Sequence, residues 1–300
     1  MIEVPVMAET VGFYTDTTVC IGCKACQVAC HQWNSLPAGK GRINLPTVHD
    51  VSLPALSGNS YDNTGSFSDV NWRHVKFIEQ ITPDRKNIAW LMMSDVCKHC
   101  VNAPCLEVCP TSAILRTEFD TVFINEPACN GCRDCVSACP FGVIHMSEDK
   151  HVAQKCTFCY DRLKNNLQPA CSQACPTQSI QFGKLADLKE RAQKRVEKLK
   201  SQGFASAQLY GADDRVLGGL NSFYLLLDKP ETYDLPSDPK LPSRNVWMSS
   251  LLSIVTAIMT GLGVLFAFRE RTTALAGRAS DGPSDPSLAR PANHPKEGHA

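Results

Sequence analysis

Sixteen cysteines are the residues of this chain whose type and spacing could do chemistry. They fall into four groups of four, and the first and third groups have the spacing C-x2-C-x2-C-x3-C. Thiols at this density either form disulfides or bind metal. The first group is Cys20, Cys23, Cys26 and Cys30, the second is Cys97, Cys100, Cys105 and Cys109, the third is Cys129, Cys132, Cys135 and Cys139, and the fourth is Cys156, Cys159, Cys171 and Cys175.

Three kinds of thiol chemistry compete for these groups. A disulfide framework is typical of small secreted domains, whereas this chain has 300 residues and a start, 1–13, without the basic and apolar regions of a signal peptide. Structural zinc prefers paired C-x2-4-C knuckles, and three cysteines within seven residues overfill one knuckle. The spacing instead matches the run of bacterial 4Fe–4S ferredoxins, and the third group adds the proline that follows it.

The ferredoxin spacing also predicts how the groups combine. Three cysteines on one short loop can bind three corners of a cluster, and the fourth points away toward a second cluster. Groups therefore work in partnered pairs. Four groups predict four 4Fe–4S clusters in two ferredoxin-like modules of the bacterial two-cluster type, an α+β fold.

Short strands and one helix are expected around the groups. Three runs continue alike, as CPTSAIL, CPFGVIHM and CPTQSIQF, so a short buried strand should follow each proline. Partners for these strands are expected at Ala89–Met93 and Thr121–Asn125. Apolar residues at helical spacing predict an amphipathic helix over Lys184–Ser201, and Asn221–Leu227 has the pattern of a buried strand.

The charge of the chain argues against one class of partner. The formal net charge is 0, so nothing predicts binding to nucleic acid. Four oxidised clusters with their thiolates would make the protein about 8 charges more negative. Lys24, Lys98, Arg133 and Lys155 stand inside or beside the cysteine groups. They either offset cluster charge and raise reduction potentials or belong to an ordinary solvated surface.

No separate catalytic motif accompanies the cysteines. The sequence has no G-x-S-x-G, no phosphate-binding Walker loop and no H-E-x-x-H. His31, His74, His99, His145 and His151 are scattered, and His99 is expected to support a cluster or lie at the surface. The chain is therefore expected to conduct electrons and not to catalyse a reaction itself.

An uncharged run near the C-terminus predicts a transmembrane helix. Residues 246–268, VWMSSLLSIVTAIMTGLGVLFAF, would form a helix about 34 Å long against a hydrocarbon core of about 30 Å. Basic residues balance across the run, and those nearest to it, Arg269 and Arg271, favour a cytoplasmic C-terminus. The composition after Thr272 predicts a disordered tail.

Several stretches together resemble a known family. CIGCKACQVACHQWN, SYDNTG, NWRHVKFIE, CKHCVNAPCLEVCPTSAI, KCTFCYDR and PACSQACPT are similar to the iron–sulfur (beta) subunit of membrane-bound respiratory formate dehydrogenase. The similarity extends over about residues 12–268, including the terminal helix. More broadly, the chain resembles the four-cluster electron-transfer subunits of molybdopterin oxidoreductases.

The resemblance implies which cysteines share a cluster. It also implies a nested domain order: 1–34 with 148–183 as an outer module, 35–89 as an insertion, 90–147 as an inner module, 184–244 as a helix and linker region, 245–269 as the transmembrane helix, and 270–300 as a disordered tail. The implied ligand sets are Cys20, Cys23, Cys26 with Cys175; Cys156, Cys159, Cys171 with Cys30; Cys97, Cys100, Cys105 with Cys139; and Cys129, Cys132, Cys135 with Cys109.

The resemblance also implies partners and a location. The expected route leads from a molybdopterin-containing alpha subunit through the clusters to a membrane cytochrome b (gamma) subunit and quinone. The globular part is expected on the periplasmic side, with a single pass through the cell membrane. Cys132 stands where some relatives have Trp and a 3Fe–4S centre, so four complete clusters are expected. An electron-transfer subunit of another molybdoenzyme or of a hydrogenase remains an alternative. A membrane-tethered metal-binding scaffold without a redox function is another.

Overall fold

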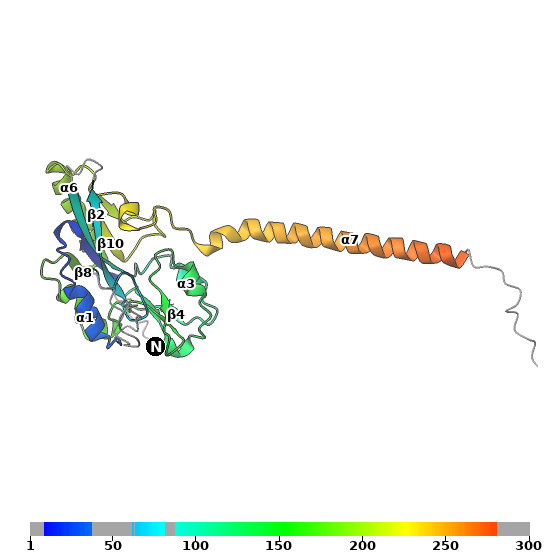
Figure 1. Cartoon of the computed structure of the whole chain (residues 1–300), viewed down its shortest axis with the longest axis horizontal. Coiled ribbons are helices and arrows are strands. Elements are labelled where there is room, and N and C mark those ends of the chain that lie inside the picture. The colour runs from blue at the N-terminus through cyan, green and yellow to red at the C-terminus, as the bar shows by residue number, and fades with distance from the viewer. Residues whose placement is uncertain (1–8, 38–61, 63, 82–87, 281–300) are drawn as a thin grey trace, which may run out of the picture. The chain divides into compact units, whose positions relative to one another are not determined.

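The chain separates into two units, Met1–Arg244 and Asn245–Ala300. The computed structural model describes residues 9–37, 62, 64–81 and 88–280. Short helices and strands alternate along the first unit, as Figure 1 shows. This mixture confirms the expected α+β class.

The largest sheet has the strand order β8-β1-β10-β9. Strand β1 (Val11–Asp16) runs antiparallel to β8 (Ile180–Lys184) and parallel to β10 (Ser222–Leu226). Strand β9 (Gln208–Tyr210) closes the far edge against β10. Every residue of β10 is buried, as expected for a central strand covered on both faces. Strand β10 confirms the buried strand predicted over residues 221–227.

A short strand follows each Cys-Pro pair, and two of these strands have partners that the sequence did not suggest. Strand β4 (Ile114–Arg116) pairs with β5 (Val122–Ile124), as predicted. Strand β6 (His145–Met146) pairs with β7 (Ala153–Gln154), a strand too short to be recognised. Strand β8 pairs with β1, from the start of the chain.

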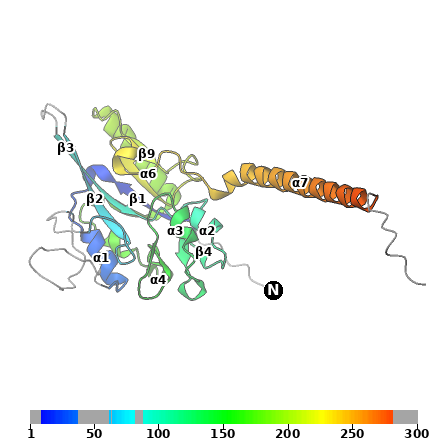
Figure 2. The ribbon, with the colours of Figure 1, turned by 45° about the vertical axis from the view of Figure 1, so that its right-hand side comes forward.

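The assignment of Ala89–Met93 as a partner for a post-proline strand is wrong. These residues belong to β3 (Ile88–Val96), which forms a nine-residue antiparallel ladder with β2 (Arg73–Ile81). Figure 2 shows the two strands side by side. The two segments are close in sequence, so they pair locally and leave the post-proline strands to other partners. Strand β2 lies within the range 35–89, of which 38–61, 63 and 82–87 lie outside the described residues.

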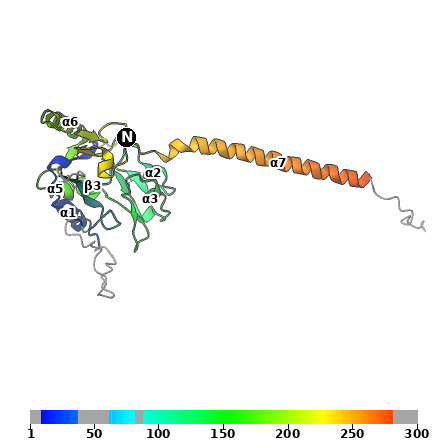
Figure 3. The ribbon, with the colours of Figure 1, turned by 45° about the horizontal axis from the view of Figure 1, so that its top comes forward.

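Short helices begin within or beside the cysteine groups. Helices α1 and α5 lie side by side in Figure 3 and pack against each other. This contact brings the first and fourth cysteine groups together. The helical segments are η1 (Thr17–Val19), α1 (Ala25–Trp33), α2 (Pro104–Glu107), η2 (Glu126–Ala128), α3 (Asp134–Ala138), α4 (Tyr160–Lys164) and α5 (Ala170–Gln173).

Helix α6 (Leu185–Ser201) confirms the predicted amphipathic helix. It buries Leu188, Ala192, Val196 and Leu199, which recur every three or four residues, and packs on β1, β8 and β9. Most of its charged residues are exposed, whereas Lys189 and Arg195 are half-buried and Arg195 forms a salt bridge with Asp16. Two further turns, η3 (Pro230–Tyr233) and η4 (Pro242–Asn245), follow β10.

The second unit contains one long apolar helix, α7 (Val246–Ser280). Within Ser249–Ala276 an 18-residue stretch has a mean hydropathy of 2.3 and none of that stretch is buried within the unit, which fits a single-pass membrane anchor. The helix continues past residue 269, so the expected tail does not begin at 270. Residues 272–280 (TTALAGRAS) contain no proline and several alanines, which permits the helix to continue.

Candidate metal centres

All sixteen cysteines are free thiols. The resemblance implies four ligand sets, which we call quartets A to D. Quartet A is Cys20, Cys23, Cys26 and Cys175; quartet B is Cys30, Cys156, Cys159 and Cys171; quartet C is Cys97, Cys100, Cys105 and Cys139; and quartet D is Cys109, Cys129, Cys132 and Cys135. The lining of two cavities and the effects of the thiols on one another's pKa support these sets.

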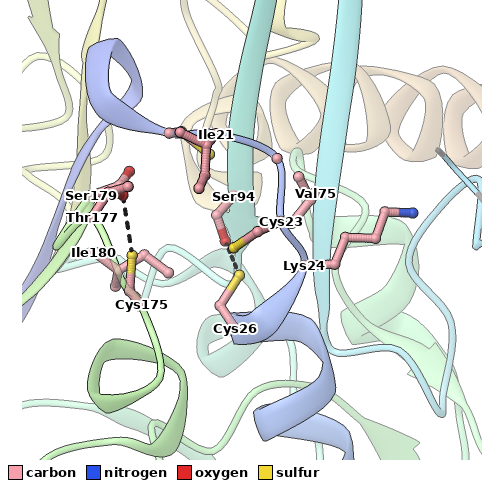
Figure 4. A pocket seen from close by; sticks show the side chains of 12 residues that line it. Ile21, Cys23, Lys24, Cys26, Val75, Ser94, Cys175, Thr177, Ser179 and Ile180 are labelled. Atoms are coloured by element: carbon pink, nitrogen blue, oxygen red, sulfur yellow. Dashed lines mark hydrogen bonds between the residues drawn. The ribbon is translucent and has the colours of Figure 1, made fainter.

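Quartet A lines a cavity of about 300 Å³. Figure 4 shows the sulfurs of Cys23, Cys26 and Cys175 directed toward one shared space, although Cys175 is far away in sequence. The Cys26 Sγ lies 3.1 Å from the Ser94 Oγ on β3. Burial raises the pKa of Cys26 to about 11, so a metal must displace a proton to bind this thiol at neutral pH.

Quartet D lines a second cavity, of about 320 Å³. Residues from α3 and its preceding loop meet Cys109, which follows α2. Burial raises the pKa of Cys135, the neighbouring thiols of Cys129, Cys132 and Cys109 add to the effect, and the pKa rises to about 11 in total. The same three-plus-one arrangement therefore occurs twice, on different parts of the chain.

The effects of neighbouring thiols on the pKa of Cys30 and of Cys100 support quartets B and C. Burial raises the pKa of Cys30 well above its ordinary value, and the thiols of Cys156, Cys171 and Cys159 add to the effect. In quartet C, burial raises the pKa of Cys100 in the same way, with further contributions from Cys97, Cys105 and Cys139. Each set contains three cysteines from one group and a fourth from the group with which it is partnered.

Electrostatic effects on the pKa of individual thiols link neighbouring quartets. The Cys26 thiol of A is influenced by Cys171 of B. The Cys156 thiol of B is influenced by Cys97 of C. The Cys105 thiol of C is influenced by Cys135 of D. These effects link the quartets in the order A, B, C, D.

The loops that carry quartets A and D share an unusual backbone conformation. Gly22 and Gly131, two residues after the first cysteine of each loop, have φ of 65° and 75°. The equivalent residues Lys24 and Arg133 have φ of 61° and 70°. This left-handed conformation is unfavourable for side chains other than glycine, and its repetition at equivalent positions indicates a shared requirement of the loop.

A left-handed residue also follows each Cys-Pro pair by the same interval. The three residues have φ between 52° and 60°, and each lies three positions after the cysteine: Ser112, Gly142 and Gln178. The internal sequence repeat is therefore also a repeat of backbone conformation.

The four basic residues near the cysteines divide into two kinds. Lys98 and Lys155 are 0% and 3% exposed, whereas Arg133 is exposed and Lys24 is half-buried. Burial lowers the pKa of Lys155, but the thiols of Cys97, Cys105 and Cys156 raise it by more. The charge-offsetting interpretation therefore fits Lys155, and the solvated-surface interpretation fits Arg133. The Lys98 ammonium instead pairs with the buried Asp95 carboxylate.

Sequence reasoning missed Arg73, which is 1% exposed and lies at the start of β2. Its range was assigned to an insertion, and no cysteine spacing points to it. His99 was noted only as a supporting or surface residue, and it is fully buried. Its Nδ1 accepts a hydrogen bond from the Val122 amide, and its Nε2 has no partner within the described part of the chain.

These features fit 4Fe–4S clusters. Among the described residues, no three His, Cys, Asp or Glu side chains converge closely enough to hold a single metal ion. Four free thiols instead surround each of two cavities, and buried donors without partners lie nearby on Arg73 and His99. Thiolate ligands with further N–H donors are the usual setting of such clusters.

Comparison of the sequence with models of protein families gives the class of protein. Two family models, both described as a 4Fe-4S dicluster domain, match residues 19–113 and 88–185. Together they include all four cysteine groups. Two two-cluster, ferredoxin-like domains are thereby established in this chain.

Individual relatives narrow the class. The nitrate-inducible formate dehydrogenase iron–sulfur subunit of Escherichia coli (strain K12) is 35% identical over 260 residues, covering 84% of this chain and 82% of the relative. A formate dehydrogenase iron–sulfur subunit of Haemophilus influenzae is 36% identical, over 83% of this chain and 76% of the relative. A thiosulfate reductase electron transfer subunit of Salmonella typhi is 36% identical, over 57% of this chain and 73% of the relative. The chain belongs to the family of formate dehydrogenase iron–sulfur subunits.

Proposed function

We propose that this chain conducts electrons through four 4Fe–4S clusters, held by quartets A to D, between a catalytic subunit and a membrane subunit of formate dehydrogenase. A 4Fe–4S cluster supplies reversible one-electron transfer when it is bound. The chain's own residues supply the ligands, fix their order and exclude water from the middle of the row. The chain itself has no catalytic role in this proposal.

Exposure along the row is the observation that carries the proposal. Among the sixteen cysteines only Cys23 and Cys132 are exposed, and they belong to quartets A and D, the two ends. Seven of the eight cysteines in quartets B and C are buried, and the eighth, Cys139, is half-buried. A conductor needs accessible ends and a protected middle, and this arrangement provides both.

The nested domain order receives support from the strand pairing. Strand β1 leads into the first cysteine group and β8 follows the fourth, and the two strands pair directly. The β4–β5 and β6–β7 pairs come from the intervening sequence. The β1–β8 and β4–β5 pairs support an outer module of residues 1–34 and 148–183 around an inner module at 90–147, and the β6–β7 pair crosses the proposed boundary between residues 147 and 148.

The partners follow from the family and from helix α7. The catalytic partner is a molybdopterin-containing alpha subunit, and the membrane partner is a cytochrome b (gamma) subunit that delivers electrons to quinone. The single apolar helix anchors the chain, with the globular unit on the periplasmic side and the C-terminus in the cytoplasm. A fluorescent protein fused after Ala300 would then fluoresce, and a periplasmic phosphatase fused there would be inactive.

A second candidate function is electron transfer through the same clusters in a different enzyme complex. The similarity to a thiosulfate reductase electron transfer subunit supports it. Other molybdoenzymes and hydrogenases would use the same row of clusters.

Reduction by substrate tests both functions. The native complex would be purified anaerobically, its iron counted, and its EPR spectrum recorded at low temperature after formate or hydrogen is added. We expect about sixteen iron atoms in this chain and cluster signals that formate elicits as dithionite does. Reduction by hydrogen but not by formate would favour the second function, and far fewer iron atoms would contradict both.

A further inference from the structure

Arg73 is a buried cation with incomplete hydrogen bonding. Its side chain is 1% exposed, and its Nη1 donates a hydrogen bond of 2.9 Å to the Ser94 Oγ. The guanidinium carbon lies 5.3 Å from the centre of the Phe13 ring. The Nε and Nη2 groups are buried and have no hydrogen-bond partner within the described residues.

Such an arrangement is costly without an anionic acceptor. A guanidinium group carries five N–H donors and its charge persists at every physiological pH. Among the described residues, no carboxylate lies within salt-bridge distance of Arg73. A buried charge without a partner is rare in native proteins, so the missing acceptor must be supplied at this site.

Thiols of two quartets lie near enough to the guanidinium group to affect its pKa. Burial lowers the pKa of Arg73, but Cys171, Cys26 and Cys156 together raise it by more. Cys26 belongs to quartet A, and the other two belong to quartet B. Ser94 also connects Arg73 to quartet A, because its Oγ contacts both the Nη1 of Arg73 and the Sγ of Cys26.

Other buried cations near the quartets have protein partners. The Lys155 ammonium, between quartets B and C, donates to the carbonyls of Val122 and Cys156. The Arg162 guanidinium, beside quartet B, donates to the Gln168 carbonyl and the Gln173 side chain. Arg73 therefore differs from them in having two donors free for sulfur.

We propose that Arg73 is a tuning residue that donates its Nε–H and Nη2–H groups to sulfur atoms of the clusters in quartets A and B. These hydrogen bonds and the positive charge stabilise the more negative, reduced state of a cluster, and so they raise its reduction potential. Arg73 thereby favours electron residence at the A–B end of the row. This inference rests on the proposed function.

Pulsed EPR on the native complex tests the contact directly. Arginine labelled with ¹⁵N in the guanidinium group would be incorporated, and the reduced clusters would be examined for ¹⁵N coupling. We expect a coupling on the A or B signal that disappears in the Arg73→Lys variant. Labelled complex without any ¹⁵N coupling, or a coupling that persists in Arg73→Lys, would overturn the proposal.

Redox titration followed by EPR tests the consequence. We expect Arg73→Met to lower the potential of a cluster in quartet A or B by about 59 mV, a tenfold change in a one-electron equilibrium, with a smaller decrease in Arg73→Lys. The control is Arg215→Met, which removes the same charge from a side chain that is 84% exposed and should leave all potentials unchanged.

The outcomes separate the two proposals. Native complex without four clusters would refute the proposed function. Four clusters whose potentials are the same in the Arg73 and Arg215 variants would overturn only the role of Arg73. If the Arg73→Met variant loses iron, the redox titration of Arg73→Lys and the ¹⁵N coupling in the native complex still test the role of Arg73.

Discussion

Cys26 and Cys30 lie one helical turn apart on α1, yet we assign them to different quartets. Residues four positions apart share a helix face and are offset by about 6 Å along the axis. Both thiols therefore point into the protein, and each reaches a different quartet. The spacing C-x3-C thus allows one helix to supply ligands to two neighbouring quartets.

Serine variants test this assignment residue by residue. We expect Cys30→Ser to perturb the same EPR signal as Cys159→Ser, because both remove a ligand of quartet B. Cys23→Ser should perturb a different signal, shared with Cys175→Ser. Each variant should lower the iron content from about sixteen toward about twelve, the loss of one cluster. If Cys30→Ser and Cys23→Ser affected one common signal, the pairing would be wrong.

The left-handed glycines give a second prediction at this scale. A Cβ added at Gly131, where φ is +75°, would lie 2.6 Å from the backbone oxygen of His151. Gly142 has φ of +60°, and a Cβ there would meet nothing within 4 Å. We expect Gly131→Ala to destabilise the folded state by about 2–3 kcal/mol and Gly142→Ala by about 1 kcal/mol. Denaturant unfolding followed by the loss of cluster absorbance would measure both, and equal effects would contradict the role of the His151 contact.

Pairing of β1 with β8 is the decisive event at the scale of elements. The register sets Val11 opposite Lys184 and Thr15 opposite Ile180. Cys20 follows β1 closely and Cys175 precedes β8 closely, so this ladder brings both into quartet A. Helix α6 then packs on the same strands and covers them from solvent.

The packing of α6 should therefore stabilise quartets A and B, which belong to the outer module. Leu188 is 1% exposed within the core, and we expect Leu188→Ala to cost about 3 kcal/mol because it leaves a cavity under the helix. Lys198→Ala, on the exposed face, should change the stability by less than about 0.5 kcal/mol. Thermal bleaching of the clusters in the purified complex would compare the two. Similar bleaching temperatures would show that α6 does not stabilise the cluster-bearing sheet.

Helix α7 belongs to the scale of the whole molecule because it fixes where the protein works. Its side chains in the described part are exposed within the unit, among them Leu252, Leu262 and Leu275. Exposed leucines over such a length are unfavourable in water and favourable in lipid. The unit Met1–Arg244 has its own core, so anchoring and electron conduction reside in separate parts of the chain.

A single charge should test the anchor. Leu262 lies near the middle of the span Ser249–Ala276, and we expect Leu262→Arg to oppose insertion by about 3 kcal/mol. The matched control, Leu275→Arg, places the same charge near the end of the span, where it can reach the interface. Alkaline carbonate extraction should release more of the first variant than of the second. Equal retention of both in the membrane would argue against α7 as the spanning element.

The sequence by itself determined the features that depend on short spacing. The ferredoxin pattern of the cysteines predicted the kind of cluster, the run at 246–268 predicted the apolar helix, and periodicity predicted α6 and β10. Each of these depends on residues within a few turns or strands of one another. Local chain geometry fixes such features before any distant contact forms.

Only the tertiary structure decided which distant segments meet. The β1–β8 ladder, the β2–β3 ladder and the burial of Arg73 next to two quartets all depend on pairing or packing between separate segments. By composition alone, several strands are equally suitable partners for any one β-strand. The sequence pattern therefore assigned Ala89–Met93 to the wrong partner. The choice between partners is made by the packing of the whole unit, and that is where the environment of the quartets is set.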